Sequence, residues 1–232
     1  MTRATASATE LGALRADLEK RFRTSTRTVM VAGREITLLS PSNADDLISE
    51  DDYVMDERLP YWADLWPSAT IMAGEVASMR LAGSKVLELG CGLGVVATGA
   101  VLAGGEVTAT DYYEDALEFA RLNVEDATGI GIATRMVNWE KMPTDLGKFD
   151  VVLASDVLYE HRYAALVAGA IATTLVRGGE AIVADPGRIA LGEFLDECHD
   201  RGLAHEARAL PYVDGEIRQT ITLYRLRWRT DV

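Results

Sequence analysis

The stretch from Lys85 to Arg201 alternates between strand-like and helix-like patterns, and this alternation constrains the fold more than any other feature of the sequence. Short apolar runs typical of strands occupy residues 86–89, 107–110, 133–137, 151–155 and 180–184. Stretches with helical periodicity follow four of these runs, at 95–102, 116–123, 163–175 and 191–201. Repeated βα units of this length predict an α/β fold with a doubly wound, mostly parallel sheet and helices on both faces.

The two ends of the chain extend this core in different ways. After Gly202 the sequence predicts two strands, 203–210 and 218–226, that form an antiparallel hairpin at the sheet edge and bring the sheet to seven strands. Residues 8–23 predict an amphipathic helix, 28–32 and 35–39 a short hairpin, and 45–58 an acidic connection. We therefore expect residues 1–58 to pack on a core domain formed by residues 59–232.

Composition limits the partners of the chain. The formal net charge is −13, which disfavours binding to nucleic acid or to anionic membranes. No stretch suits a membrane span, and the first residues lack the apolar core of a secretory signal, so we expect a cytoplasmic protein. The two cysteines, Cys91 and Cys198, lack metal-ligand spacing, and we expect no metal site.

A glycine-rich turn, V-L-E-L-G-C-G-L-G, follows the first strand of the core. Such a turn lets a ligand approach the backbone and the N-terminus of the next helix. The dinucleotide pattern G-x-G-x-x-G fails, because Val95 stands where its third small residue belongs. Glu88 would repel a diphosphate but accept hydrogen bonds from an ammonium group. Asp111 ends the second strand, where a carboxylate can accept ribose hydroxyls.

The pattern E-x-G-x-G-x-G with a following strand-end acid resembles the class I, seven-β-strand methyltransferases that use S-adenosylmethionine (SAM) and release S-adenosylhomocysteine (SAH). Three more stretches are L-P-Y-W-A-D-L-W-P-S-A (59–69), D-V-L-Y (156–159) and D-P-G-R (185–188). Together they resemble the protein-lysine methyltransferase branch, and most of all the enzymes that methylate the β subunit of electron-transfer flavoprotein. The resemblance covers roughly residues 55–190.

The resemblance implies a site and a partner. Asp156 and Tyr159 would be catalytic and face the target amine, which a protein substrate would present as a lysine. The flavoprotein β subunit is one such candidate substrate. The implied cofactor-binding residues are Trp66, Glu88, Gly90, Cys91, Gly92, Gly94, Asp111, Tyr112, Asn138, Trp139 and Ser155.

Alternatives stay open at several of these positions. Asp156 also suits a helix N-cap, with or without a catalytic role. Trp62 and Trp66 lie four residues apart and would share a face if the segment were helical, so we assign Trp62 to the core and Trp66 to the pocket. For the whole chain, a small-molecule N- or O-methyltransferase is the first alternative function. An NAD-binding reductase or a non-catalytic nucleotide-binding module is the second.

Overall fold

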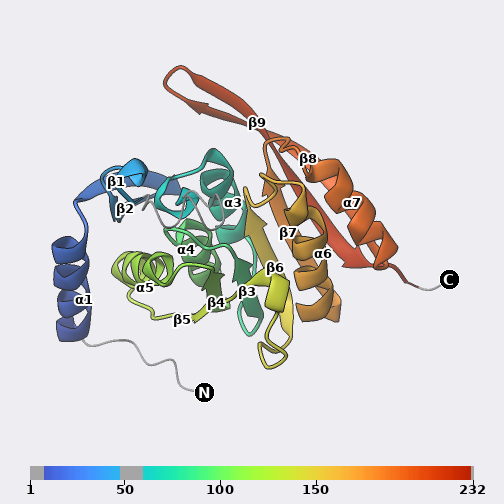
Figure 1. The fold of residues 1–232 in the computed structure, drawn as a ribbon, viewed down its shortest axis with the longest axis horizontal. Helices are drawn as coiled ribbons and strands as arrows, with labels where there is room; N and C mark the ends of the chain where they lie inside the picture. Colours follow the sequence, from blue (N-terminus) through green and yellow to red (C-terminus); the bar gives the residue numbers. More distant parts are fainter. Residues whose placement is uncertain (1–7, 48–59, 231–232) are drawn as a thin grey trace.

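A seven-stranded sheet forms the centre of the computed structural model, which describes residues 8–47 and 60–230 (Figure 1). Its strands lie in the order β5-β4-β3-β6-β7-β9-β8. The first five strands of this order are parallel, whereas β9 is antiparallel to both of its neighbours. The predicted fold class is confirmed. The bounds are β3 Lys85–Leu89, β4 Glu106–Asp111, β5 Ala133–Met136, β6 Phe149–Ser155, β7 Leu175–Asp185, β8 Leu203–Asp214 and β9 Ile217–Trp228.

Helices cover both faces of the sheet because the central strands are apolar on both faces. In β6, Val151 and Leu153 belong to the cluster that packs on α3, α4 and α5, whereas Val152 and Ala154 pack on α6 and α7. Alternate residues of β6 therefore pack against the helix layers on opposite faces of the sheet, as expected of a buried parallel strand. The helices are α1 Ala8–Arg21, α3 Pro67–Ala77, α4 Val95–Leu102, α5 Glu114–Thr128, α6 Arg162–Thr174 and α7 Leu191–Asp200, with short 3₁₀ turns η1 Ala44–Leu47, η2 Tyr61–Ala63 and η3 Trp139–Lys141.

The N-terminal elements form a third apolar cluster beside the sheet layers. The predicted hairpin is present as β1 Thr24–Val31 and β2 Arg34–Pro41, and it packs with α1 against α5. Arg21 of α1 forms ion pairs with Asp115 and Glu118 of α5. The predicted boundary between residues 58 and 59 and most of the acidic connection lie outside the described residues, so the two-part division stays a prediction.

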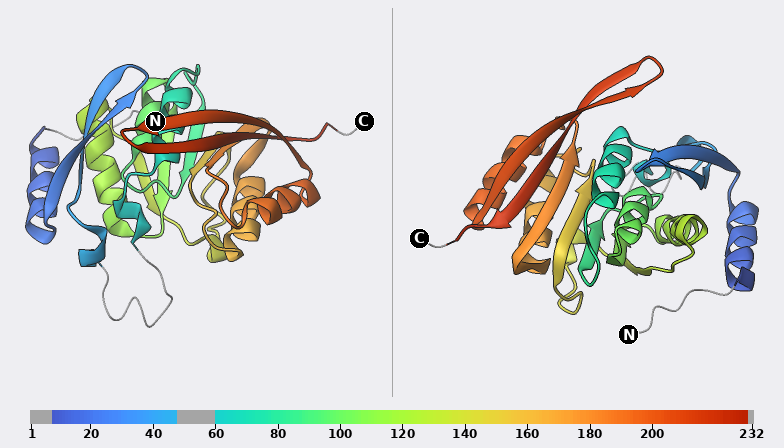
Figure 2. Two further views of the ribbon diagram at one scale, coloured as in Figure 1. Left: turned by 90° about the horizontal axis from the view of Figure 1, so that it is seen from above. Right: turned by 180° about the vertical axis from the view of Figure 1, so that it is seen from behind.

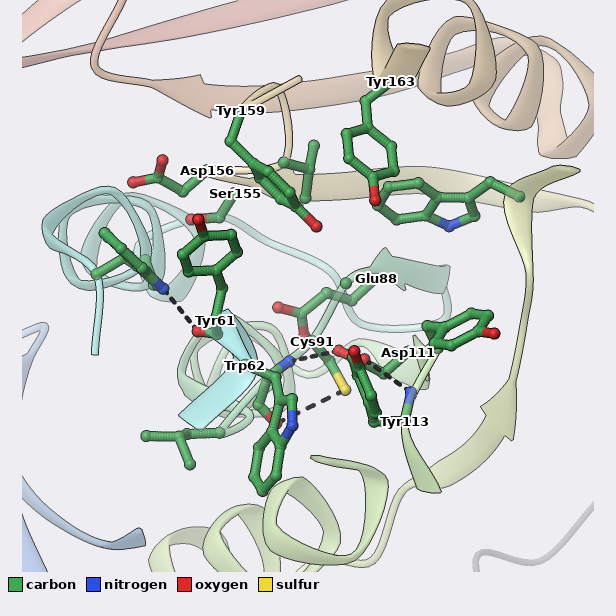
Figure 3. Close-up of a pocket in the computed structure, with 18 of the residues that line it drawn as sticks. Tyr61, Trp62, Glu88, Cys91, Asp111, Tyr113, Ser155, Asp156, Tyr159 and Tyr163 are labelled. Carbon is green, nitrogen blue, oxygen red and sulfur yellow. Dashed lines mark hydrogen bonds between the residues drawn. The ribbon is translucent and has the colours of Figure 1, made fainter. Parts of the chain in front are cut away.

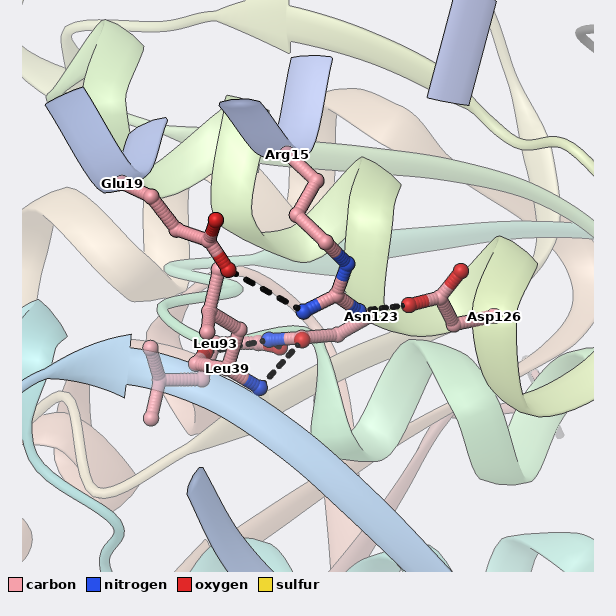
Figure 4. Close-up of polar contacts among 6 residues, drawn as sticks. All are labelled: Arg15, Glu19, Leu39, Leu93, Asn123 and Asp126. Atoms are coloured by element: carbon pink, nitrogen blue, oxygen red, sulfur yellow. Dashed lines mark hydrogen bonds and ion pairs between the residues drawn. The ribbon is translucent and has the colours of Figure 1, made fainter. Parts of the chain in front are cut away.

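A buried amide on α5 joins the hairpin to the sheet (Figure 4). The Asn123 side chain is 1% exposed and accepts a hydrogen bond from the Leu39 N–H at 2.8 Å. Its amide nitrogen donates to the Leu39 and Leu93 carbonyls, both at 3.0 Å. Leu93 belongs to the glycine-rich turn, so one side chain holds β2 and that turn together.

The C-terminal hairpin reaches beyond the sheet (Figure 2). Asp185, the last residue of β7, pairs with Thr222, so residues 217–221 of β9 continue past the carboxyl edge of the parallel strands. The strands are longer than predicted, and Val213 and Ile217 near the tip are exposed. Within the described residues, no helix has the length and apolar character needed to cross a membrane.

Candidate active site

A cavity opens at the carboxyl ends of β3, β4 and β6 (Figure 3). The strand order reverses there, because β3 lies between β4 and β6, and open α/β sheets bind ligands at such a switch point. The residues that line it include every predicted site residue except Gly94: Trp66, Glu88, Gly90, Cys91, Gly92, Asp111, Tyr112, Asn138, Trp139, Ser155, Asp156 and Tyr159.

The glycine-rich turn forms the floor of the cavity and is tied to β4. The N–H groups of Gly90 and Cys91 both donate to the Thr110 carbonyl at 2.9 Å. Gly94 is the N-cap residue of α4 and has a φ of 80°, and a Cβ there would lie 2.8 Å from Cα of Ala120. Gly94 therefore acts by close packing of the turn, outside the cavity lining.

Glu88 lies at the end of β3 and is 2% exposed. Its Oε2 atom is buried without a hydrogen-bond partner. Burial raises the pKa of this carboxyl, a backbone hydrogen bond from Ala97 lowers it, and the nearby Asp111 raises it further. A buried acid that has one unpartnered oxygen and lies beside a second acid is costly unless a cation joins them, so the residues fit the ammonium group of a SAM methionine.

Asp111 ends β4 on the other side of the turn. Its Oδ2 accepts the Gly92 N–H at 3.0 Å and its Oδ1 accepts the Tyr113 N–H at 3.1 Å. Burial raises its pKa, while these backbone bonds lower it. These bonds, with a further one from the Tyr112 backbone, orient the Asp111 carboxylate and leave it acceptor capacity for a ribose hydroxyl.

The far wall comes from the segments that follow β4 and β5. The Asn138 side chain caps η3 by accepting the Glu140 N–H at 2.9 Å, and Trp139 packs edge-on against Tyr163 at 5.6 Å between ring centroids. Tyr112 is 45% exposed at the rim. Ser155, at the end of β6, has a buried hydroxyl without a partner. An adenine would fit between these aromatic and amide groups.

A cluster of tyrosine rings lies next to Trp139, on the side of the cavity formed by the segments after β6 and before α3. Tyr159 lies 5.0 Å from Tyr61 and 4.7 Å from Tyr163, measured between ring centroids. Burial raises the pKa of the Tyr159 phenol, and Tyr163 raises it further. Tyr159 therefore stays a neutral phenol that offers a ring face and a hydroxyl, and it does not serve as a phenolate base.

Asp156 occupies a strained position directly after β6, with a φ of 60°. Its Oδ2 accepts the Ser68 hydroxyl at 2.9 Å, and its Oδ1 accepts Nε of Arg188 at 2.6 Å. In Figure 3 the carboxylate points away from Glu88 and Asp111. The helix-cap interpretation is wrong, because α6 begins at Arg162 with His161 as its N-cap residue.

The tryptophan segment contributes more to the cavity than predicted. Residues 61–63 form a 3₁₀ turn and Trp66 is the N-cap residue of α3, so the two tryptophans do not share one helix face. Trp62, assigned to the core, is buried and also lines the cavity, and its carbonyl would lie 3.0 Å from a Cβ at Gly92. Trp66 lines the cavity and donates its indole N–H to the Tyr61 carbonyl at 2.9 Å.

Several lining residues lay outside the predicted set. Tyr61 belongs to the P-Y-W-A stretch, which was the available signal for it. Tyr163 follows Tyr159 by four residues, a spacing that could have indicated that the two rings lie together. Tyr113, next to the predicted Tyr112, also lines the cavity. Ser68 and Arg188 reach Asp156 from sequence positions too distant for spacing to reveal.

A family model described as "Methyltransferase domain" matches residues 81–226, which is more than half of the chain and includes β3, β4, β6 and β7. The chain belongs to this family of methyltransferase domains. Membership decides against the NAD-binding reductase alternative.

Curated relatives of this methyltransferase differ in their named acceptors. Protein N-lysine methyltransferase METTL21A of Xenopus tropicalis is 34% identical over 44% of this chain and 50% of its own length. A ubiquinone biosynthesis O-methyltransferase of Azotobacter vinelandii is 36% identical over 44% of this chain and 44% of its own length. The chain thus spans about half the length of the curated relatives it matches.

Solved methyltransferase structures share the fold. Magnesium protoporphyrin IX methyltransferase from Synechocystis PCC 6803, crystallised with bound SAM, superposes with a TM-score of 0.58 at 19% identity. The match covers 80% of this chain and 98% of that chain. At this identity the likeness supports the mostly parallel sheet with antiparallel C-terminal strands.

Proposed function

We propose that this methyltransferase transfers a methyl group from SAM to a lysine side-chain amine of a protein. The observation that carries the proposal is the lining of the cavity, which combines five acids with a set of aromatic rings. The acids are Asp64, Glu88, Asp111, Glu140 and Asp156. Acidic and aromatic groups together favour a cationic ligand and a cationic product over a phenol or a carboxylate.

The donor is S-adenosylmethionine, which carries an electrophilic methyl group on a sulfonium and leaves as SAH. In the proposed complex Glu88 accepts hydrogen bonds from the methionine ammonium, and Asp111 accepts the ribose hydroxyls. Asn138 and Trp139 hold the adenine. The lone pair of the amine forms the new N–C bond while the C–S bond electrons return to sulfur, and the amine must have lost its proton first.

The acceptor end must bring a lysine in neutral form. At neutral pH a free lysine is deprotonated about once in 10³ to 10⁴ molecules, equivalent to roughly 4 to 5 kcal/mol. The rings of Tyr61, Tyr159 and Tyr163 exclude water from the amine, which lowers this cost. They also place π faces beside the methylated product. Asp156 is the proposed acceptor of the amine N–H groups.

The β subunit of electron-transfer flavoprotein is the proposed first protein to test as acceptor. The support is the P-Y-W-A-D-L-W-P and D-P-G-R stretches, of which the first lies at the cavity in Tyr61 and Trp66. The lysine-methyltransferase relatives support a protein acceptor more generally.

The deciding experiment incubates the protein with methyl-labelled SAM and a lysate that has been separated into protein and metabolite fractions. We expect label in a protein band, and mass spectrometry should locate the added methyl groups on lysine. Asp111→Asn serves as the control with impaired cofactor binding. Label confined to small metabolites would instead support the second candidate, a small-molecule methyltransferase, which the ubiquinone O-methyltransferase relative favours.

A further inference from the structure

Arg188 forms a polar and an aromatic contact at the acceptor end of the cavity. Its Nε donates to Asp156 Oδ1 at 2.6 Å, and its guanidinium carbon lies 5.1 Å from the ring centroid of Trp66. The Asp156 side chain is 2% exposed and that of Arg188 is 33% exposed. This ion pair is therefore partly shielded from water, where the attraction between its charges is stronger than at the surface.

The surrounding backbone fixes this ion pair from both sides. Asp185 Oδ1 accepts the N–H groups of Gly187 and Arg188, both at 2.7 Å, which holds the turn after β7. On the other side, the Asp156 N–H donates to the Ala184 carbonyl at 2.9 Å, and the Ser68 hydroxyl holds Oδ2. The pair thus joins the ends of β6 and β7 to the first turn of α3.

An unpaired carboxylate at this position would hinder the reaction. A negative charge beside a lysine stabilises the ammonium form and raises its pKa, whereas methyl transfer needs the neutral amine. An adjacent guanidinium cancels most of that field while it leaves the second lone pairs of the carboxylate available to orient an N–H group.

We propose that Arg188 is a positioning residue for methyl transfer: it holds the Asp156 carboxylate in a neutral pair, so that the acceptor lysine loses its proton at a lower pH than it would beside an unpaired acid. This inference rests on the proposed lysine acceptor. It assigns control of the pKa of the acceptor amine to Arg188, which does not itself line the cavity.

Other titratable groups face the same region. None of them is changed by a substitution at Arg188, so a variant there tests the loss of the Arg188 charge alone. Burial raises the pKa of Asp185, and its hydrogen bonds from Arg188 and Gly187 lower it. The titratable groups that face the region are Tyr61 and Asp64 before α3, Glu88 on β3, Cys91 in the glycine-rich turn, Asp111 on β4, Tyr112 and Tyr113 after it, Glu140 on η3, Tyr159 and Tyr163 around the start of α6, Asp185 on β7 and Tyr224 on β9.

The test measures methyl transfer as a function of pH, with the protein labelled in the lysate experiment as acceptor. Arg188→Met keeps an apolar stem on Trp66 and removes the charge. We expect the midpoint of its kcat profile, which reports the pKa of the amine in the bound complex, to rise by about one pH unit, which is about a tenfold loss of kcat at neutral pH. Arg188→Lys should keep the original midpoint. Arg188→Met combined with Asp156→Asn should bring the midpoint back, because the unpaired charge is gone.

A matched control comes from the other end of β7. Arg177 stacks on Trp228 with its guanidinium carbon 4.1 Å from the ring centroid, remote from the cavity, so Arg177→Met should leave the profile unchanged. SAH affinity, measured by calorimetry, should be equal in all of these variants. A uniform loss of rate in Arg188→Met without a change of midpoint would overturn the inference.

A second readout separates failure of this inference from failure of the proposed function. The Nε–H signal of Arg188 in nitrogen–proton NMR spectra, assigned with Arg188→Lys, should shift in Asp156→Asn whether or not an acceptor is known. An unshifted signal would refute the ion pair and with it the inference. A shifted signal without any labelled lysine would refute the proposed lysine acceptor instead. The proposed effect of Arg188 on the pKa of that lysine would then be refuted with it.

Discussion

Replacing Asn123 with alanine should destabilise the fold strongly although the residue touches no ligand. The side chain is 1% exposed and makes three hydrogen bonds to the backbone of Leu39 and Leu93. Each buried neutral hydrogen bond contributes about 1 kcal/mol net, so Asn123→Ala should cost about 3 kcal/mol. The total stability of a domain is about 5 to 15 kcal/mol, so this is a large fraction of it.

Urea unfolding followed by circular dichroism measures this loss, and the melting temperature should fall by about 6 to 12 °C. Asn123→Asp provides a sharper variant, because it keeps an acceptor for the Leu39 N–H but sets an oxygen against the Leu39 and Leu93 carbonyls. Its cost should exceed that of alanine at neutral pH and shrink in acid, where protonation restores one donor.

Thr173→Ala is the control, since Thr173 also bonds to backbone carbonyls, of Gly169 and Ala170, but is exposed. Its cost should stay within about 0.5 kcal/mol. A loss below about 1 kcal/mol for Asn123→Ala would show that water or backbone adjustment satisfies these groups, and it would refute the account of how the hairpin is held.

Four further predictions concern the donor end of the cavity and the glycine-rich turn beneath it. Burial raises the native pKa of Glu88 above its unfolded value, so its contribution to stability is present in acid and is lost as the pH rises through the native pKa. Glu88→Gln should therefore raise the melting temperature of the free protein at alkaline pH while it weakens SAH binding in calorimetry, and unchanged melting would contradict the raised pKa. SAH binding to the unaltered protein should release protons at neutral pH, because an ammonium partner favours the ionised Glu88; calorimetry in buffers of different ionisation enthalpy detects this release. Gly94→Ala should cost about 2 to 4 kcal/mol in urea unfolding, since its φ is 80° and the new Cβ would lie 2.8 Å from Cα of Ala120; a cost near zero would mean that α5 can move away. Asp111→Asn should weaken SAH at least tenfold and also lower the melting temperature, because its amide nitrogen replaces one of the two oxygens that accept backbone N–H groups; equal affinity would remove Asp111 from the donor site.

The sequence allowed prediction of the sheet and the donor end because both depend on local patterns. Apolar runs and helical periodicity placed most of the elements within a few residues. Glu88 and Asp111 could be brought together in advance, since the carboxyl ends of adjacent parallel strands meet at one edge. Strand β7 was the exception, because its start was predicted five residues too late. It begins directly after α6, and Gly178 and Gly179 interrupt the apolar pattern of its first five residues.

The acceptor end depended on contacts that no spacing rule encodes. The side chain of Asp156 is oriented by a positive φ and by Arg188, 32 residues further along the chain. The length of the C-terminal hairpin was also missed, because the first strand continues past Pro211 through residues 212–214, which are mostly exposed and show no apolar alternation. Trp62 was assigned to one environment although a large ring can pack in the core and border a cavity at once.

The strand order divides the cavity into two halves with separate supports. The donor half rests on the glycine-rich turn and its bonds to Thr110, whereas the acceptor half comes from the loop after β6 and the turn before α3, with the loop after β7 behind them through the contact of Arg188 with Asp156. Substitutions in those loops leave the donor framework intact. During divergence such a scaffold can exchange its acceptor while it retains its donor, so we expect sequence drift among descendants of this chain to gather at residues 156–163 and 185–189 and to spare residues 86–94.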